Sequence, residues 1–127
     1  MKLYYSMTIM GQVPGKKNSK RIATNRRTNK PYIISSKKAL DWKEEASSQM
    51  WGKLPIPGVF DKCKIKMEFY NKDKRRHDLD NMAATVLDFL VEQDIIGDDD
   101  CEHVSELKLI FGGVCKEAPR VWIEMEA

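Results

Sequence analysis

Residues 63–90, CKIKMEFYNKDKRRHDLDNMAATVLDFL, carry the strongest fold signal in the chain, because two periodicities follow each other within them. The segment 63–71 alternates with period two, as a half-buried strand does. Its inward positions are Cys63, Ile65, Met67 and Phe69. From residue 79 onward the apolar side chains are spaced by three and four, which is typical of an amphipathic helix. These helical positions are Leu79, Met82, Ala83, Val86, Leu87 and Leu90. The stretch therefore predicts a strand and then a helix over 79–91, joined by a basic connection.

The segments before this stretch predict two further strands and a second helix. Residues 3–10, LYYSMTIM, are rich in β-branched and aromatic types and predict a first strand. Residues 11–30 contain Gly, Pro, Asn and many cations, which predicts a long exposed loop. PYIIS at 31–35 predicts a short strand. Ser36 is then placed as the N-cap of a helix over 37–51.

The C-terminal part predicts the end of the sheet. Residues 102–111 and 120–126 are two strand-like segments separated by Gly112, Gly113 and Pro119, so we expect a closing hairpin. At 127 residues the chain has the size of one domain, 1–127, with one modest core. The predicted fold class is α+β, with two main helices packed on a small mixed or antiparallel sheet.

Charge is distributed unevenly along the chain. The net charge is +3, yet residues 1–40 hold ten Lys or Arg and no Asp or Glu. The remaining 87 residues hold twelve Lys or Arg and nineteen Asp or Glu. The first acid is Asp41. A basic first third joined to an acidic remainder indicates two surfaces with different tasks. The basic one suits a polyanion, of which nucleic acid is the commonest soluble example.

Composition also bounds the compartment. The apolar stretches are too short to cross a bilayer, and the segment MKLYYSMTIM lacks the features of a signal peptide. The three cysteines are odd in number and share no metal-binding spacing. We therefore expect reduced thiols, a cytoplasmic location and no membrane partner.

Two aspartates stand at the start of the 79–91 helix. Residues two apart on a helix point about 200° away from each other, so Asp78 and Asp80 converge only if Asp78 is the extended N-cap. Both carboxylates then lie at the positive end of the helix dipole, which favours their ionised form. Capping needs only one of them. The second, with Asn81 beside it, exceeds the structural requirement.

Further acids follow the same helix. Asp88 lies about 12 Å along the axis from Asp80, so we expect it to be a solvated or salt-bridged surface residue. Asp98, Asp99 and Asp100 come after the helix has ended and the chain has turned. The segment 93–99, extended at about 3.3 Å per residue, is long enough to run back along a helix of about 20 Å. Either it returns to Asp78 and Asp80, or it meets those of a partner subunit.

Converging carboxylates need a divalent cation, and oxygen-only ligands select Mg²⁺ or Mn²⁺. Such a metal serves phosphodiester hydrolysis because it activates water and stabilises the leaving oxygen. The neighbouring segment KDKRR (72–76) supplies cations for phosphates. The pattern therefore predicts either a capped, solvated acidic turn or a metal-dependent nuclease site, and the acid-free basic third supports the second. His77 beside it is either an exposed loop residue or a phosphate contact.

The string RRHDLDN (75–81), a helix of this length and the turn IIGDDD (95–100) resemble the RusA family of Holliday-junction endonucleases, of phage and prophage type. The first strand, the basic segment opening with PGKKNSKR and the C-terminal strands occur in the same order, so the resemblance covers nearly the whole chain. It implies a homodimer that binds a four-way DNA junction and nicks two strands symmetrically with Mg²⁺. A two-fold dimer suits paired cuts because each cut needs its own site.

The resemblance also implies site residues. Asp78, Asp80 and Asp99 match the family's metal-binding aspartates, and Asp98 matches the acid beside the third. The cations expected to contact DNA are Lys16, Lys17, Lys20, Arg21, Arg26, Arg27, Lys74, Arg75 and Arg76.

One position departs from the family pattern. Many members have a lysine four residues after the second aspartate, where this chain has Ala84. The change removes a transition-state cation, which Lys74, Lys16 or Lys17 would have to replace. Two alternatives to the nuclease are therefore kept: a branched-DNA-binding protein that does not cut, and a small interaction domain whose acidic turn docks a basic protein.

Overall fold

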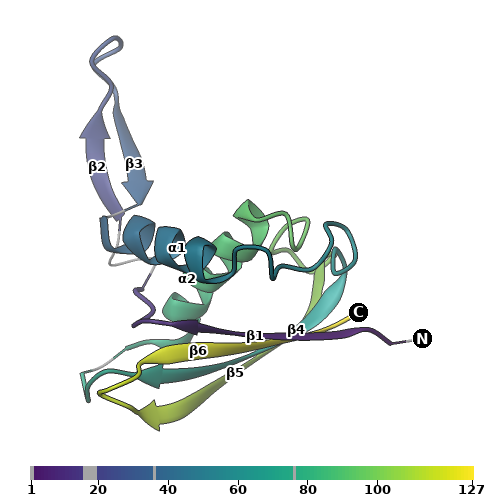
Figure 1. Cartoon of the computed structure of the whole chain (residues 1–127). Helices are drawn as coiled ribbons and strands as arrows, with labels where there is room; N and C mark the ends of the chain where they lie inside the picture. The colour runs from purple at the N-terminus through teal and green to yellow at the C-terminus, as the bar shows by residue number, and fades with distance from the viewer. Residues whose placement is uncertain (1, 16–19, 36, 76) are drawn as a thin grey trace.

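The computed structural model describes residues 2–15, 20–35, 37–75 and 77–127. These described residues form two α-helices and six strands (Figure 1). In chain order they are β1 Tyr4–Met10, β2 Lys20–Thr24, β3 Pro31–Ser35, α1 Lys37–Gln49, β4 Cys63–Asn71, α2 Leu79–Glu92, β5 Val104–Val114 and β6 Arg120–Glu126. The chain forms a small α+β domain, as predicted. No helix in the described part of the chain is long and apolar enough to cross a membrane.

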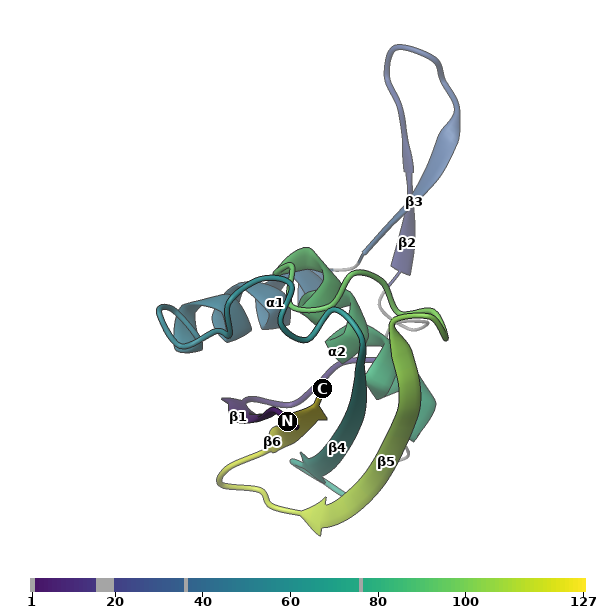
Figure 2. The same ribbon diagram turned by 90° about the vertical axis from the view of Figure 1, so that its right-hand side faces the viewer.

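Four strands form a mixed sheet in the order β1-β6-β4-β5. β4 pairs with β5 in parallel and with β6 antiparallel, and β1 pairs with β6 antiparallel. Both helices lie on the same face of this sheet (Figures 1 and 2). β2 and β3 pair only with each other in a separate two-stranded sheet.

The core lies between the helices and that face of the sheet. The alternation predicted for residues 63–71 is confirmed, because Ile65, Met67 and Phe69 are at most 2% exposed. α2 covers them with its apolar stripe, and Trp42 of α1 packs edge-on against Phe89 with ring centroids 5.7 Å apart. Burial of each such large side chain contributes about 1.5–3 kcal/mol, so this face determines how α2 is oriented on the sheet.

An ion pair joins the two helices beside the core. The Lys43 ammonium of α1 lies 2.8 Å from a Glu92 carboxylate oxygen and 3.8 Å from one of Asp88, both on α2. The prediction that Asp88 is a salt-bridged or solvated residue is thereby confirmed. Asp88 therefore takes part in the contact between α1 and α2 and is not a member of the predicted metal-binding set.

The predicted closing hairpin is wrong. Both strands form, but β4 lies between β5 and β6, so these neighbours in sequence do not pair. The reason is the helix: α2 carries the chain back along the sheet, and β5 then runs parallel to β4 as the second strand of a βαβ unit. The order of strands follows from this crossover and not from the short connection after Val114.

The long exposed loop predicted for residues 11–30 is also wrong in part. Lys20–Thr24 form β2, and Val13 is buried at 2% exposure. The helix predicted over 37–51 ends at Gln49, and its predicted N-cap Ser36 lies outside the described residues. All three cysteines are free, and burial raises the pKa of the Cys63 thiol to about 11.

Candidate functional site

The acid pair, defined as Asp78 and Asp80, lies at the beginning of α2. Asp78 is the N-cap with extended backbone (φ −84°, ψ 124°), as its position in the sequence predicted, and its carboxylate makes no capping hydrogen bond. Asp80 is exposed in the first turn, where one of its oxygens accepts the Asn81 backbone N–H at 2.9 Å. Both side chains therefore stand at the positive end of the helix dipole.

The segment 11–15 packs directly against this end of α2. The Thr85 hydroxyl donates to the Pro14 carbonyl oxygen at 2.7 Å. A Cβ atom at Gly15 would lie 2.3 Å from the Asn81 side-chain nitrogen, so only glycine permits the approach. Asn81 and Thr85 are both buried. Segment 11–15 thus contacts the first turns of α2, which carry the acid pair, and the run of cations begins directly after this segment.

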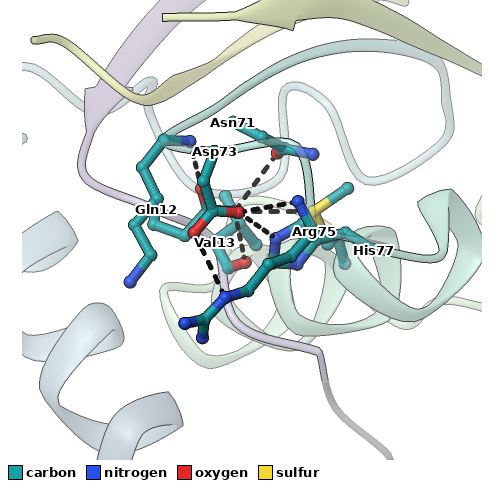
Figure 3. A network of polar contacts seen from close by, with 8 residues as sticks. Gln12, Val13, Asn71, Asp73, Arg75 and His77 are labelled. Atoms are coloured by element: carbon teal, nitrogen blue, oxygen red, sulfur yellow. Dashed lines mark hydrogen bonds and ion pairs between the residues drawn. The ribbon is translucent and has the colours of Figure 1, made fainter. Parts of the chain in front are cut away.

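A glutamine side chain holds the same segment to the end of β4 (Figure 3). Gln12 Nε2 donates to Asn71 Oδ1 and to the Val13 carbonyl oxygen, each at 3.2 Å. Gln12 Oε1 accepts the Lys72 backbone N–H at 2.7 Å. Because Asn71 is buried, losing this partner would leave a buried amide unsatisfied. Segment 11–15, the end of β4 and the start of α2 are therefore joined by polar contacts.

The connection from β4 to α2 is ordered by Asp73 (Figure 3). One carboxylate oxygen accepts the Arg75 backbone N–H at 3.0 Å and lies 3.4 Å from His77 Nε2. Partial desolvation opposes ionisation of Asp73, but these hydrogen bonds outweigh it and lower its pKa. The Arg75 side chain remains 83% exposed. His77 is half-buried against Asp73, so it is part of this turn and not the fully exposed loop residue that we considered.

A groove of about 620 Å³ lies between segment 10–15, the first turns of α1 and segment 72–77. Its charged lining consists of Lys38, Asp41, Glu45, Lys72, Arg75 and His77. Trp42 lies at its base, where the indole N–H is buried and has no hydrogen-bond partner among the described residues. The groove thus combines both signs of charge next to the acid pair.

The aspartate turn, defined as Asp98–Asp100, lies elsewhere. Asp98 accepts the Asp99 backbone N–H at 2.8 Å, and Asp100 lies 2.6 Å from His103 Nδ1. The hydrogen bond with His103 lowers the pKa of Asp100, and the same bond raises the pKa of His103. Gly97 stands so close to Asp61 and His103 that a Cβ atom there would overlap both side chains.

One chain does not bring the acid pair and the aspartate turn together. The acid pair is at the Asn71 end of β4, whereas His103, next to the aspartate turn, bonds to the Cys63 end. At about 3.3 Å per residue these strand ends are about 26 Å apart. In the described residues no group of three or more His, Cys, Asp or Glu side chains could hold a metal ion. Segment 93–99 was predicted either to return to Asp78 and Asp80 of its own chain or to meet those of a partner subunit. The return within one chain is not observed.

Six of the predicted DNA-binding cations lie at three described places, and the other three are not described. Arg26 and Arg27 are exposed in the turn between β2 and β3, and Lys74 and Arg75 are exposed just before the acid pair. The backbone of Lys20 and Arg21 lies in β2. Lys16, Lys17 and Arg76 lie outside the described residues.

Sequence reasoning missed the residues that join these parts. Gln12, Gly15, Asn71 and Thr85 carry no charge, and two of them stand in a segment predicted to be an exposed loop. The signal that was present is Val13, because it stands between Gln12 and Pro14 in a mostly polar segment and valine is among the residue types most often buried.

Comparison with known proteins adds no assignment, because no protein-family model matches the chain and no curated protein matches it.

Ala84 is half-buried on α2, one turn after Asp80. Residues four apart share a helix face, so Ala84→Lys would bring an ammonium group to the acid pair. If the chain cuts DNA, we expect this variant to raise the cleavage rate about 10-fold or more, since a cation at a developing oxyanion is a large term. Single-turnover cleavage of a labelled four-way junction measures it.

Ala84→Met is the matched control, because it adds similar length without charge. An equal increase for Met and Lys would contradict the electrostatic argument. The unchanged rate of the lysine variant would show that another cation already serves this position.

Proposed function

We propose that this protein is a Mg²⁺-dependent endonuclease that cuts branched DNA, with a four-way junction as its substrate and a homodimer as its working form. One observation carries the proposal: two exposed carboxylates, Asp78 and Asp80, stand on a helical turn that contacts the start of the basic segment through Gly15. A phosphodiester substrate needs both charges at one place, cations for its backbone and oxygen ligands for a metal.

The predicted ligands are all carboxylates, which suit Mg²⁺ or Mn²⁺, but one chain does not bring all of them to one place. One chain places two exposed carboxylates, those of Asp78 and Asp80, at the start of α2, and the remaining predicted ligands, Asp98 and Asp99, would come from a second copy. A metal bound there would supply Lewis-acid activation of water and stabilisation of the leaving oxygen. Lys74 and Arg75, four and three residues before Asp78, would neutralise the flanking phosphates.

The outer edge of β5 is the surface that suits a second copy. In the described part of the chain β5 is an edge strand that pairs only with β4, and it exposes apolar side chains, with Leu107 at 40% and Phe111 at 54%. The opposite edge differs, because both backbone groups of Met10 in β1 are hydrogen-bonded to the Gln49 side chain. Long apolar edges favour pairing with another strand.

Antiparallel pairing of two β5 strands about Leu109 would be self-complementary. Leu107 of each copy would then face Phe111 of the other, as a two-fold interface requires. β5 begins beside the aspartate turn and ends beside Asn71, because the Cys115 backbone N–H bonds to the Asn71 carbonyl oxygen. This pairing would therefore carry the aspartate turn of one copy toward the acid pair of the other.

A four-way junction with labelled arms tests the proposal. With Mg²⁺ or Mn²⁺ we expect paired symmetric nicks, and with a chelator we expect binding without cleavage. Affinity should fall about 10³-fold or more from 50 to 200 mM salt if the protein contacts six or more phosphates. Strand products on denaturing gels and fluorescence anisotropy are the two measurements.

The alternative function is that of a branched-DNA binder that does not cut, and Ala84 favours it because the family's lysine is absent. This alternative predicts salt-sensitive binding to the junction and no nicks with either Mg²⁺ or Mn²⁺. Salt-insensitive or absent affinity for DNA would contradict both and favour the interaction domain.

A further inference from the structure

The hairpin of β2 and β3, residues 20–35, stands clear of the layered domain. Its strands pair antiparallel from Lys20 opposite Ser35 to Thr24 opposite Pro31. In both views it extends away from the helices and the four-stranded sheet (Figures 1 and 2). A two-stranded ribbon is at best marginally stable in water by itself. A partner that binds it would add contacts to the exposed residues 24–31.

The tip of this hairpin is a defined turn. The Asn25 backbone N–H donates to the Lys30 carbonyl oxygen at 3.0 Å, and the Asn29 N–H donates to the Asn25 carbonyl oxygen at 2.7 Å. The Asn25 side chain accepts the Arg27 N–H at 2.9 Å. Asn29 adopts a positive φ of 57°, a conformation that asparagine tolerates well. The turn thus holds Arg26 and Arg27 at the far end of the hairpin.

Charge selects the kind of partner. The hairpin contains five cations and no acid, and the first acid in the chain is Asp41. Residues 24–31, which include Arg26, Arg27 and Lys30, are all exposed. A projecting hairpin that carries positive charge and no carboxylates suits a polyanionic partner, and one with a groove wide enough to admit the hairpin. The major groove of DNA, about 12 Å wide, accepts a two-stranded β-ribbon.

We propose that this hairpin inserts into the major groove of a duplex arm, with Arg26 and Arg27 contacting base edges and adjacent phosphates. Arginine is suited to this position because its planar group bonds both major-groove acceptors of guanine, N7 and O6. The inference rests on the proposed function only in taking DNA as the partner. It assigns the hairpin to double-stranded arms and not to the strand that is cut.

The start of the basic segment connects this contact to the acid pair. Pro14 and Gly15 pack on Thr85 and Asn81 of α2, two residues and one residue, respectively, before the cations begin. Only residues 16–19 separate Gly15 from Lys20, so the arm held by the hairpin would stay within a limited distance of Asp78 and Asp80. Groove contact at a set separation from the acid pair is what a structure-selective enzyme needs to place its cut.

The test compares Arg26→Ala/Arg27→Ala with the control Lys53→Ala/Lys116→Ala, which removes two exposed cations from other surfaces. Anisotropy with a chelator present measures affinity for a four-way junction and for single strands of the same length, across salt concentrations. We expect the arginine variant to lose at least about 10-fold in junction affinity and to lower the salt slope by about 2. Single-strand affinity should change no more than in the control.

A second measurement identifies the groove. Junction arms rich in 7-deazaguanine lack the N7 acceptor, and they should weaken the unaltered protein while leaving the arginine variant unaffected. Circular dichroism and thermal unfolding confirm that both variants are folded. Loss equal to the control, equal loss on single strands, or no effect of 7-deazaguanine overturns the proposal. Because no cleavage is involved, the hairpin assignment can hold while the nuclease proposal fails, and the reverse is also true.

Discussion

Asp80→Asn is expected to abolish cleavage of a four-way junction while leaving junction binding intact or stronger. The substitution keeps the size of the side chain but removes one of the two charges offered to a metal at the start of α2. Loss of a group that stabilises developing charge costs about 10²–10³-fold in rate, and a metal ligand should reach at least this range. Binding improves because a negative charge next to the phosphates is lost.

Folding should be nearly unaffected, because Asp80 is exposed and its favourable interaction with the helix dipole is worth only about 0.3–1 kcal/mol. Asp94→Asn is the matched control, since Asp94 is exposed and has a positive φ of 58°, a conformation that asparagine accepts. Single-turnover rates and anisotropy are measured on the same preparations. Cleavage at the unaltered rate by purified Asp80→Asn would refute the metal assignment.

Two inactive variants are expected to restore each other when mixed. If a site uses Asp80 of one copy and Asp99 of the other, a heterodimer of Asp80→Asn with Asp99→Asn has one doubly altered site and one unaltered site. Random exchange makes half of the dimers mixed, so about a quarter of the wild-type sites should return. The products should be single nicks, because each mixed dimer has only one working site.

The control mixes Asp78→Asn with Asp80→Asn. Both changes fall on the same half of the proposed site, so every heterodimer keeps two damaged sites and stays inactive. Native mass spectrometry measures how many heterodimers form. An Asp80→Asn and Asp99→Asn mixture that forms heterodimers but cuts no better than either variant alone would mean that sites are not shared between copies.

Several local features could be predicted from the sequence because each depends on residues close together in the chain. The alternation of 63–71 and the three-and-four spacing after Leu79 produced β4 and α2 with bounds within one residue at either end. The extended N-cap at Asp78 followed from its place before that helix. The polar contacts of Gln12 and Thr85 could not be predicted, since each joins residues about 60 to 70 positions apart.

By itself, the amino-acid sequence determined the strand-helix unit of residues 63–91, the α+β class and the separation of an acid-free basic third from an acidic remainder. These properties arise from side-chain periodicity and charge, which are local. Tertiary structure decided that β4 lies between β5 and β6, that residues 20–35 form a projecting hairpin, and that the acid pair and the aspartate turn stand at opposite ends of one sheet. The physical reason is the crossover of α2: a helix that buries its apolar stripe against β4 must carry the chain the length of the strand before β5 can begin.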